Sequence, residues 1–177
     1  MERVKKLHPN FSLEVSNDIH NFLRKELKEP CLTVDLPHIL TPYFAAHNEK
    51  SLGFHLANSV GAQKIIVSPH SIDLANGCYQ GVFLFQNKAH TSTFFPERWS
   101  YTDFTHCLLS LLKYGNRSPD PRNKKRQIIE GAYKDAMGAQ IHALMVFDKD
   151  NKKVVATYPI VTSPKNTDRS KKFYQYK

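Results

Sequence analysis

The sequence predicts a single α+β domain, because helical and strand patterns occupy separate blocks of the chain. Apolar residues recur at helical spacing within residues 15–28 and 100–115, and short β-prone runs lie between and after these segments. The last part, residues 127–161, is predicted as a β-meander with two polar turns. A length of 177 residues suffices to bury one substantial core.

The two predicted helices have clear ends. The first carries an apolar stripe and stops at Pro30, since proline cannot continue a helix. The second is capped by Ser100, and Gly115 is placed to close it. Its stripe is Phe104, Cys107, Leu108, Leu111 and Leu112, so Cys107 is expected in the core.

The predicted strands are short and separated by turn residues. Asn76-Gly77 marks one turn, and residues 31–54 and 116–125 are expected to be irregular, the latter as an exposed loop. The expected strands are residues 64–67, 79–86, 91–95, 127–134, 140–147 and 153–161. Residues 127–134 also allow a helix, and we prefer the strand because the turn at 135–138 leads into the next strand.

Composition restricts the class of protein. The net charge of +9 and the isoelectric point of about 9.5 favour a polyanionic partner such as nucleic acid. Basic residues cluster in 122–126 and 165–177. The apolar runs are too short to cross a bilayer, and no apolar stretch follows the charged N-terminus, so we expect no membrane association, no standard secretion signal, and action in a cytoplasm. Three cysteines with no close pair argue against a disulfide framework or a structural zinc site.

Three residues indicate a chemistry. His38 and His55 lie in segments where irregular backbone can direct side chains into a cleft, and Lys88 opens a β-prone stretch. Two imidazoles can move a proton, and an ammonium group can stabilise a developing anion. This combination can cleave RNA without a metal, by turning the 2'-hydroxyl on its own phosphodiester. Gly53, two residues before His55, would let the backbone approach a phosphate.

Several motifs, taken in order, resemble the EndoU family of uridylate-preferring endoribonucleases, and most closely its bacterial members. They are Leu36-Pro37-His38-Ile39-Leu40, Gly53-Phe54-His55, Lys88 with Thr91-Ser92-Thr93-Phe94-Phe95-Pro96 and Trp99-Ser100, and Val155-Ala156-Thr157-Tyr158-Pro159-Ile160. The resemblance covers roughly residues 38–161. It implies two small antiparallel β-sheets that form a cleft, with helices packed outside. The expected organisation is a helical extension at 1–30, a nuclease domain at 31–165 and a basic tail at 166–177.

The resemblance also implies roles for individual residues. His55 would be the general base, His38 the general acid, and Lys88 the cation facing the transition state. Gly53, Ser92, Thr157 and Tyr158 would contact the substrate, with Ser92 and Tyr158 on the base. The products would be a 2',3'-cyclic phosphate and a 5'-hydroxyl.

One position departs from the family pattern. Ala156 stands where relatives carry threonine or serine, two residues before the tyrosine, and Thr157 follows it. Adjacent side chains on a strand point to opposite faces, so Thr157 would reach a base only if a bulge shifted it.

No cofactor and no dedicated metal site are expected, although some relatives depend on manganese and stimulation by Mn²⁺ stays open. The expected partners are RNA and, if the chain is a bacterial toxin or effector module, an acidic immunity protein. Two other hypotheses stand beside this one. The chain could be a catalytically inactive RNA-binding or interaction protein on the same scaffold. A metal-dependent phosphodiesterase is a weaker alternative, because the sequence lacks the carboxylates that such a metal site needs.

Overall fold

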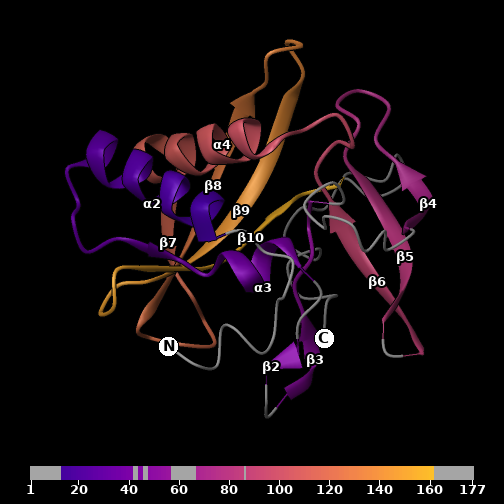
Figure 1. Cartoon of the computed structure of the whole chain (residues 1–177), viewed down its shortest axis with the longest axis horizontal. Coiled ribbons are helices and arrows are strands. Elements are labelled where there is room, and N and C mark those ends of the chain that lie inside the picture. Colours follow the sequence, from indigo (N-terminus) through magenta and orange to yellow (C-terminus); the bar gives the residue numbers. More distant parts are fainter. Residues whose placement is uncertain (1–12, 42–43, 46–47, 57–66, 86, 162–177) are drawn as a thin grey trace.

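The computed structural model describes residues 13–41, 44–45, 48–56, 67–85 and 87–161. The chain forms a mixed α+β fold, in which helices and sheets occupy different parts of the molecule (Figure 1). The elements are α2 (Leu13–Leu27), β1 (Thr33–Val34), α3 (Leu36–Leu40), β2 (Phe44–Ala45), β3 (Asn48–Leu52), β4 (Val67–Ile72), β5 (Tyr79–Phe85), β6 (Lys88–Phe94), α4 (Tyr101–Tyr114), β7 (Asn116–Pro119), β8 (Arg126–Lys134), β9 (Gln140–Asp148) and β10 (Lys153–Pro159).

The strands build a large and a small sheet. The large sheet has five strands in the order β1-β10-β9-β8-β7, all antiparallel except the β1–β10 pair. The small sheet is the antiparallel meander β4-β5-β6, and β2 and β3 form a separate two-stranded ribbon. The expected α+β class is therefore confirmed.

Helix α4 begins and ends where the sequence predicted. Ser100 and Asp103 form a reciprocal capping box at its start, and the Gly115 N–H donates to the Leu111 carbonyl at its end. The helix lies across one face of the five-stranded sheet (Figure 1). Close approach requires glycine: a Cβ on Gly131 would stand 3.1 Å from the Leu111 side chain. Cys107, on this helix, is fully buried in the core, as predicted.

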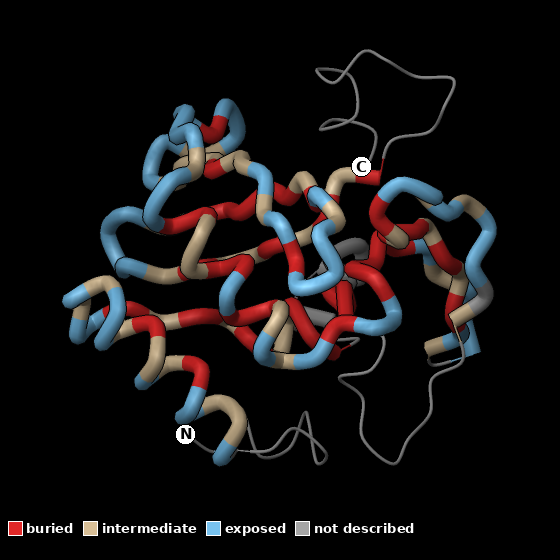
Figure 2. Tube along the Cα trace, turned by 90° about the horizontal axis from the view of Figure 1, so that it is seen from above, coloured by how far each residue is buried: buried red, intermediate tan, exposed pale blue. Residues whose placement is uncertain are grey.

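Helix α2 packs beside α4 and belongs to the same core. Ile19 and Leu23 are buried in the main apolar cluster with the α4 side chains, and Figure 2 shows the buried trace concentrated where the layers meet. His20 ties this helix to the large sheet. Its Nδ1 lies 2.7 Å from the Ser16 carbonyl oxygen, and its Nε2 accepts the Val34 N–H at 3.0 Å. The first helix is thus packed into the body of the fold.

The small sheet has an aromatic core of its own. Phe54 packs edge-on against Phe83 and Phe94 with ring centroids 5.0 and 5.1 Å away, and Tyr79 stacks on Phe94. Phe54 lies outside the small sheet in the sequence. Its ring therefore attaches the segment around His55 to this sheet.

The structure differs from the sequence-based expectations in three places. Residues 116–125 are not all loop, because β7 pairs with β8 as an exposed edge strand. The irregular region 31–54 contains β1, the short helix α3 and the ribbon β2–β3. The strand expected to end at Pro69 continues through it as β4, with a register shift between Pro69 and Ser71, and residues 64–66 lie outside the described part. Short elements of two to six residues carry too little periodicity to be recognised locally.

A buried carboxylate links the small sheet to the large one. Asp135, in the β8–β9 turn, accepts hydrogen bonds from Arg98 Nη2 and from Trp99 Nε1, the latter at 3.0 Å. Its other oxygen accepts the N–H groups of Met137 and Ala139 at 3.0 and 2.9 Å. Burial alone would raise the pKa of Asp135, but the hydrogen bonds from Trp99, Arg98 and Ala139 together lower it. The ionised form is therefore the one the fold stabilises.

Asp135→Ala should reduce the free energy of unfolding by about 3 kcal/mol, because it leaves the buried Trp99 N–H and the turn amides without an acceptor. Urea denaturation measures this loss. Asp150→Ala, at an exposed carboxylate in the β9–β10 turn, is the matched control and should change stability by less than about 0.5 kcal/mol. Equal stability of the two variants would contradict the assigned role.

Candidate active site

His38 is presented by helix α3, whose start is fixed by Asp35 and Pro37. Asp35 caps the helix by accepting the His38 backbone N–H at 3.3 Å, and Pro37 supplies a helical φ angle in the first turn. Leu36, Ile39 and Leu40 are buried, which leaves His38 half-buried at the helix surface. A helix too short to be stable alone is held in this way by its packing.

His55 is fastened to the same helix by backbone hydrogen bonds. The Phe54 N–H lies 3.2 Å from both the His38 and the Ile39 carbonyl oxygens, and the His55 N–H donates to the Ile39 carbonyl at 2.8 Å. On the other side, the His55 carbonyl accepts the Phe95 N–H at 2.9 Å. The two candidate histidines are therefore brought together by main-chain contacts, at the junction of the two larger sheets.

Gly53 makes this contact sterically feasible. A Cβ at this position would stand 1.2 Å from the His38 carbonyl oxygen, which no side chain can do. The sequence suggested that Gly53 is glycine so that a phosphate can approach. The structure gives a different reason for glycine here, because the Gly53 backbone packs directly against the His38 carbonyl. Contact of Gly53 with a phosphate stays a prediction.

Phe54 has an unusual backbone conformation. Its φ of +82° lies in the left-handed region, which costs a bulky residue about 1–3 kcal/mol. The hydrogen bond of its N–H to helix α3 and the packing of its ring among the aromatic residues of the small sheet offset this cost. Strain of this kind, held by its surroundings, is often found at functional sites.

The ring of His55 is oriented by its Nδ1 atom. Nδ1 lies 2.7 Å from the Thr93 carbonyl oxygen, so it carries the proton and donates there. The Ser92 hydroxyl lies 3.2 Å from the same nitrogen and donates to the Phe54 carbonyl at 3.1 Å. Nε2 is consequently left with its lone pair, as a proton acceptor. Ser92, which the resemblance places on the base, is engaged in holding His55.

Burial favours the neutral form of both histidines. Burial lowers the pKa of His55 to about 4, against the hydrogen bond to Thr93, which favours the charged form, and the neighbouring His38 lowers it further. Burial also lowers the pKa of His38; the nearby Asp35 carboxylate opposes this shift, and Lys153 reinforces it. Lys153 and Asp35 form an ion pair with 2.9 Å between Nζ and Oδ2. The site therefore has a carboxylate and an ammonium group close to its half-buried histidine.

Tyr158 stands beside His55 because of a bulge in β10. The pairing of β10 with β9 shifts by one residue between Val154 and Ala156, so Val154 and Thr157 both face the core, each 0 % exposed. Tyr158 then points to the opposite face, where its ring centroid lies 5.5 Å from that of His55. Without the bulge, alternation along the strand would have turned Tyr158 inward.

Thr157 is consequently not at this site. It lies in the row Ile129–Met145–Thr157, on the sheet face that α4 covers, and its hydroxyl has no hydrogen-bond partner among the described residues. The bulge that the sequence argument required is present, but it directs Tyr158, and not Thr157, toward the histidines.

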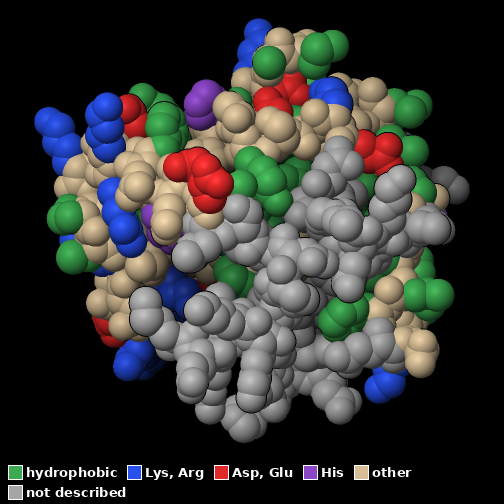
Figure 3. Space-filling model, viewed as in Figure 1, with side chains coloured by type: hydrophobic (Ala, Val, Ile, Leu, Met, Phe, Trp, Pro, Cys, Tyr) green, Lys and Arg blue, Asp and Glu red, His purple; other side chains and the backbone are tan. Residues whose placement is uncertain are grey.

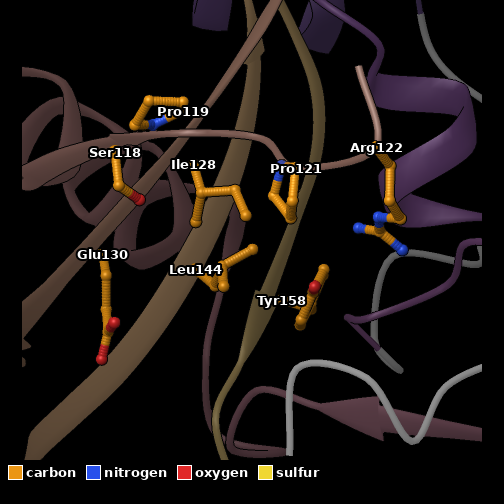
Figure 4. A pocket seen from close by; sticks show the side chains of 8 residues that line it. All are labelled: Ser118, Pro119, Pro121, Arg122, Ile128, Glu130, Leu144 and Tyr158. Carbon is orange, nitrogen blue, oxygen red and sulfur yellow. The ribbon is translucent and has the colours of Figure 1, made fainter. Parts of the chain in front are cut away.

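A small pocket of about 160 Å³ opens on the face of the large sheet that α4 does not cover (Figure 4). Leu144, Ile128 and two prolines form its apolar lining, and its polar groups come from Ser118, Glu130, Arg122 and Tyr158. The volume is below the usual 300–1,000 Å³ of drug-sized sites, so the pocket suits a single ring system rather than a large cofactor. Because Tyr158 lines it, the pocket adjoins the histidine pair.

Lys88 lies apart from these groups. It is exposed at the start of β6, opposite Phe85, whereas His55 contacts Thr93 near the other end of the same strand. Five residues of extended chain separate Lys88 from Thr93, about 16 Å at a rise of about 3.3 Å per residue. The structure brings His38, His55, Gly53, Ser92 and Tyr158 together, and does not bring Lys88 or Thr157 to them.

The structure adds residues that the sequence did not single out. Arg122 belongs to the basic run at 122–126, but its place at the pocket depends on the β7–β8 connection folding over the sheet. Glu130 could have been noticed in the sequence, because it is a carboxylate within the otherwise uncharged interior of β8. Lys153 was predicted only as part of a strand.

Basic side chains are scattered on the visible face of the molecule. In Figure 3, the Lys and Arg side chains of the described residues stand at separate positions on this face. The basic tail at 166–177 lies outside the described residues. Within the described ranges, no group of three or more His, Cys, Asp and Glu side chains is arranged to hold a metal ion, and no helix has the length and apolarity needed to cross a membrane.

Comparisons of this chain with protein-family models, with curated proteins and with solved structures find no match.

Gly53→Ala should destabilise the protein by at least about 2 kcal/mol and displace helix α3, since the new methyl group would overlap the His38 carbonyl. Thermal unfolding, together with the NMR signals of the His38 and His55 rings, would detect both effects. Gly138→Ala is the control, because its Cβ would meet nothing closer than 3.9 Å and only its φ of +81° is unfavourable. Histidine signals unchanged in Gly53→Ala would refute the proposed contact.

Proposed function

We propose that this chain is an endoribonuclease that cleaves RNA through the 2'-hydroxyl, with His38 and His55 as the proton-transfer pair. The observation that carries the proposal is the backbone contact between helix α3 and the His55 segment, which brings a half-buried and a buried histidine close enough for His38 to lower the pKa of His55. The resemblance to the EndoU family, in motif order and in the α+β outline with two separate sheets, supports it.

His55 is suited to act as the general base. Donation of Nδ1–H to Thr93 leaves Nε2 as the acceptor, which could take the proton of the 2'-hydroxyl as the oxygen attacks phosphorus. His38, in its protonated form, would give a proton to the departing 5'-oxygen. One proton enters and one leaves the enzyme, and the products are a 2',3'-cyclic phosphate and a 5'-hydroxyl.

Positive charge near the phosphate would come from Arg122 at the pocket and Lys153 near His38. We leave Lys88 out of this proposed chemistry because of its distance along β6. The expectation of uridine preference is also left out, because the Ser92 hydroxyl is bonded to the Phe54 carbonyl and Thr157 is buried in the core. RNA as the partner, an acidic immunity protein and action in a cytoplasm remain predictions from charge and resemblance.

The test is incubation of the purified protein, with EDTA present, with a mixed-sequence RNA oligonucleotide and its all-deoxy counterpart. Cleavage of the RNA alone, ending in a cyclic phosphate, is expected. His38→Ala and His55→Ala should each lower kcat by about 10²–10⁴-fold, the usual contribution of a general acid or base. His70→Ala, at an exposed histidine of β4, is the control and should retain activity. Full activity of His55→Ala would refute the proposal, and RNA binding without cleavage would favour the non-catalytic alternative.

The dependence of kcat/KM on pH should be bell-shaped with a maximum below pH 6.5. His55 must be neutral to act as base, so activity rises as pH increases through about 4. His38 must be protonated to act as acid, and burial lowers its pKa below the ordinary histidine value of 6.5, so activity falls again before pH reaches that value. Rates measured from pH 3.5 to 8 test this, and a rate still rising at pH 8 would contradict the assignment. Bound phosphate favours the charged imidazole, so the maximum of kcat should lie at higher pH than that of kcat/KM.

A further inference from the structure

The pocket beside Tyr158 contains the carboxylate of Glu130. Glu130 is half-buried on β8, and its side chain has no hydrogen bond or ion pair with any residue that the structure describes. The neighbouring Ser118 hydroxyl, on β7, is likewise without a described partner. An ionised carboxylate accepts hydrogen bonds and donates none. Beside the apolar lining of Leu144 and Ile128, Glu130 is therefore an acceptor that a bound molecule can satisfy.

The sheet register places Glu130 in line with the candidate active site. Glu130 pairs with Leu144, and Leu144 pairs with Tyr158, so the three side chains form one row across adjacent strands. Strands lie about 4.8 Å apart, which puts the Glu130 backbone about 10 Å from that of Tyr158. Figure 4 shows Glu130 at one end of the pocket and Arg122 with Tyr158 at the other, with Leu144 between them.

The arrangement of Glu130 at one end of the pocket and Arg122 at the other fits a nucleotide bound in one orientation. The sugar and phosphate would lie at the Arg122 and Tyr158 end, near His55, while the ring of the base lies over Leu144. The hydrogen-bonding edge of the base then faces Glu130. A volume of about 160 Å³ is consistent with a single ring system held there.

We propose that Glu130 makes this pocket selective for guanine. Guanine is the RNA base that presents two adjacent donors on one edge, N1–H and N2–H, and a carboxylate can accept both in parallel. Adenine and cytosine each present one amino donor next to a ring-nitrogen acceptor, which a carboxylate repels. Uracil presents its N3–H between two carbonyl acceptors, the least favourable arrangement. The cleavage preference rests on the proposed nuclease function, whereas guanine binding by the pocket does not.

Selectivity of this kind differs from the uridine preference that the family resemblance implies. Two of the residues expected to contact the substrate are unavailable, because the Ser92 hydroxyl is bonded within the His55 segment and Thr157 is in the core. Glu130 and Ser118 are the pocket's polar side chains with no described partner, so base recognition falls to them.

The experiment uses four DNA oligonucleotides that each contain one ribonucleotide, G, A, C or U, with the full-length protein and three variants. We expect kcat/KM at ribo-G to exceed that at ribo-U by about 10- to 100-fold, the range for one bidentate base contact. Glu130→Gln should remove this preference, mainly by lowering kcat/KM at ribo-G. Glu14→Gln, at an exposed position of α2, should leave the preference intact, and Ser118→Ala should reduce it partially.

Binding separates failure of this proposal from failure of the nuclease function. NMR titration with guanosine 3'-monophosphate and uridine 3'-monophosphate is run on the same proteins. If no oligonucleotide is cleaved, but the guanosine ligand binds more tightly and Glu130→Gln abolishes the difference, the pocket assignment stands and the nuclease proposal fails. Cleavage that is fastest at ribo-U, or equal loss at all four bases in Glu130→Gln, overturns guanine selectivity. Equal or absent binding of the two nucleotides also overturns it.

Discussion

The candidate site depends on one set of main-chain hydrogen bonds. The carbonyl groups at the end of a five-residue helix accept the N–H groups of Phe54 and His55, so the two histidines are positioned by backbone rather than by side-chain contacts. Backbone positioning is rigid, since it does not depend on rotamers. It also explains why Gly53 has no room for a side chain and why Phe54 keeps an unfavourable φ angle. Helix α3, the His55 segment and the end of β6 then act as one unit.

That unit lies between two separate apolar cores. Phe54 packs into the aromatic cluster of the small sheet, whereas Leu56, two residues later, is buried in the main core beneath the helices. The segment that carries His55 therefore connects the two cores, and Asp135 provides a second, polar connection through Arg98 and Trp99. Binding sites are often found at such junctions between structural layers.

On the face of the large sheet opposite α4, the position of Tyr158 depends on the bulge in β10. One extra residue in β10 turns Tyr158 out beside His55 and moves Thr157 into the core. The same row of the sheet then carries Tyr158, Leu144 and Glu130, an aromatic ring, an apolar floor and a carboxylate. A bulge next to a site, redirecting one side chain, is a frequent device in β-proteins.

The sequence alone determined the parts of this protein that rest on local physics. The apolar stripes of α2 and α4, the caps of α4, the turn at Gly77 and most strands of the meander are features of this kind. They follow from periodicity, from Ser100 and Gly115 at the ends of α4, and from the positive φ angle of Gly77. Strand β7, helix α3 and the continuation of β4 through Pro69 were missed, because such short pieces exist only through tertiary pairing. The sequence also indicated His38 and His55 as a pair, through their motifs, and named Tyr158 and Ser92 near them.

Tertiary structure alone decided which groups meet. Lys88 is the first residue of β6, whereas His55 contacts Thr93 near the other end of this strand, a separation that the order of the motifs does not encode. Glu130 and Arg122 join the pocket through sheet register and the course of the β7–β8 connection, both of which depend on long-range pairing. The bulge in β10 reversed the faces of Thr157 and Tyr158, because a shift of one residue in a strand exchanges its two sides. Residue types fix the available chemistry, and the packing of the chain selects which of them can act together.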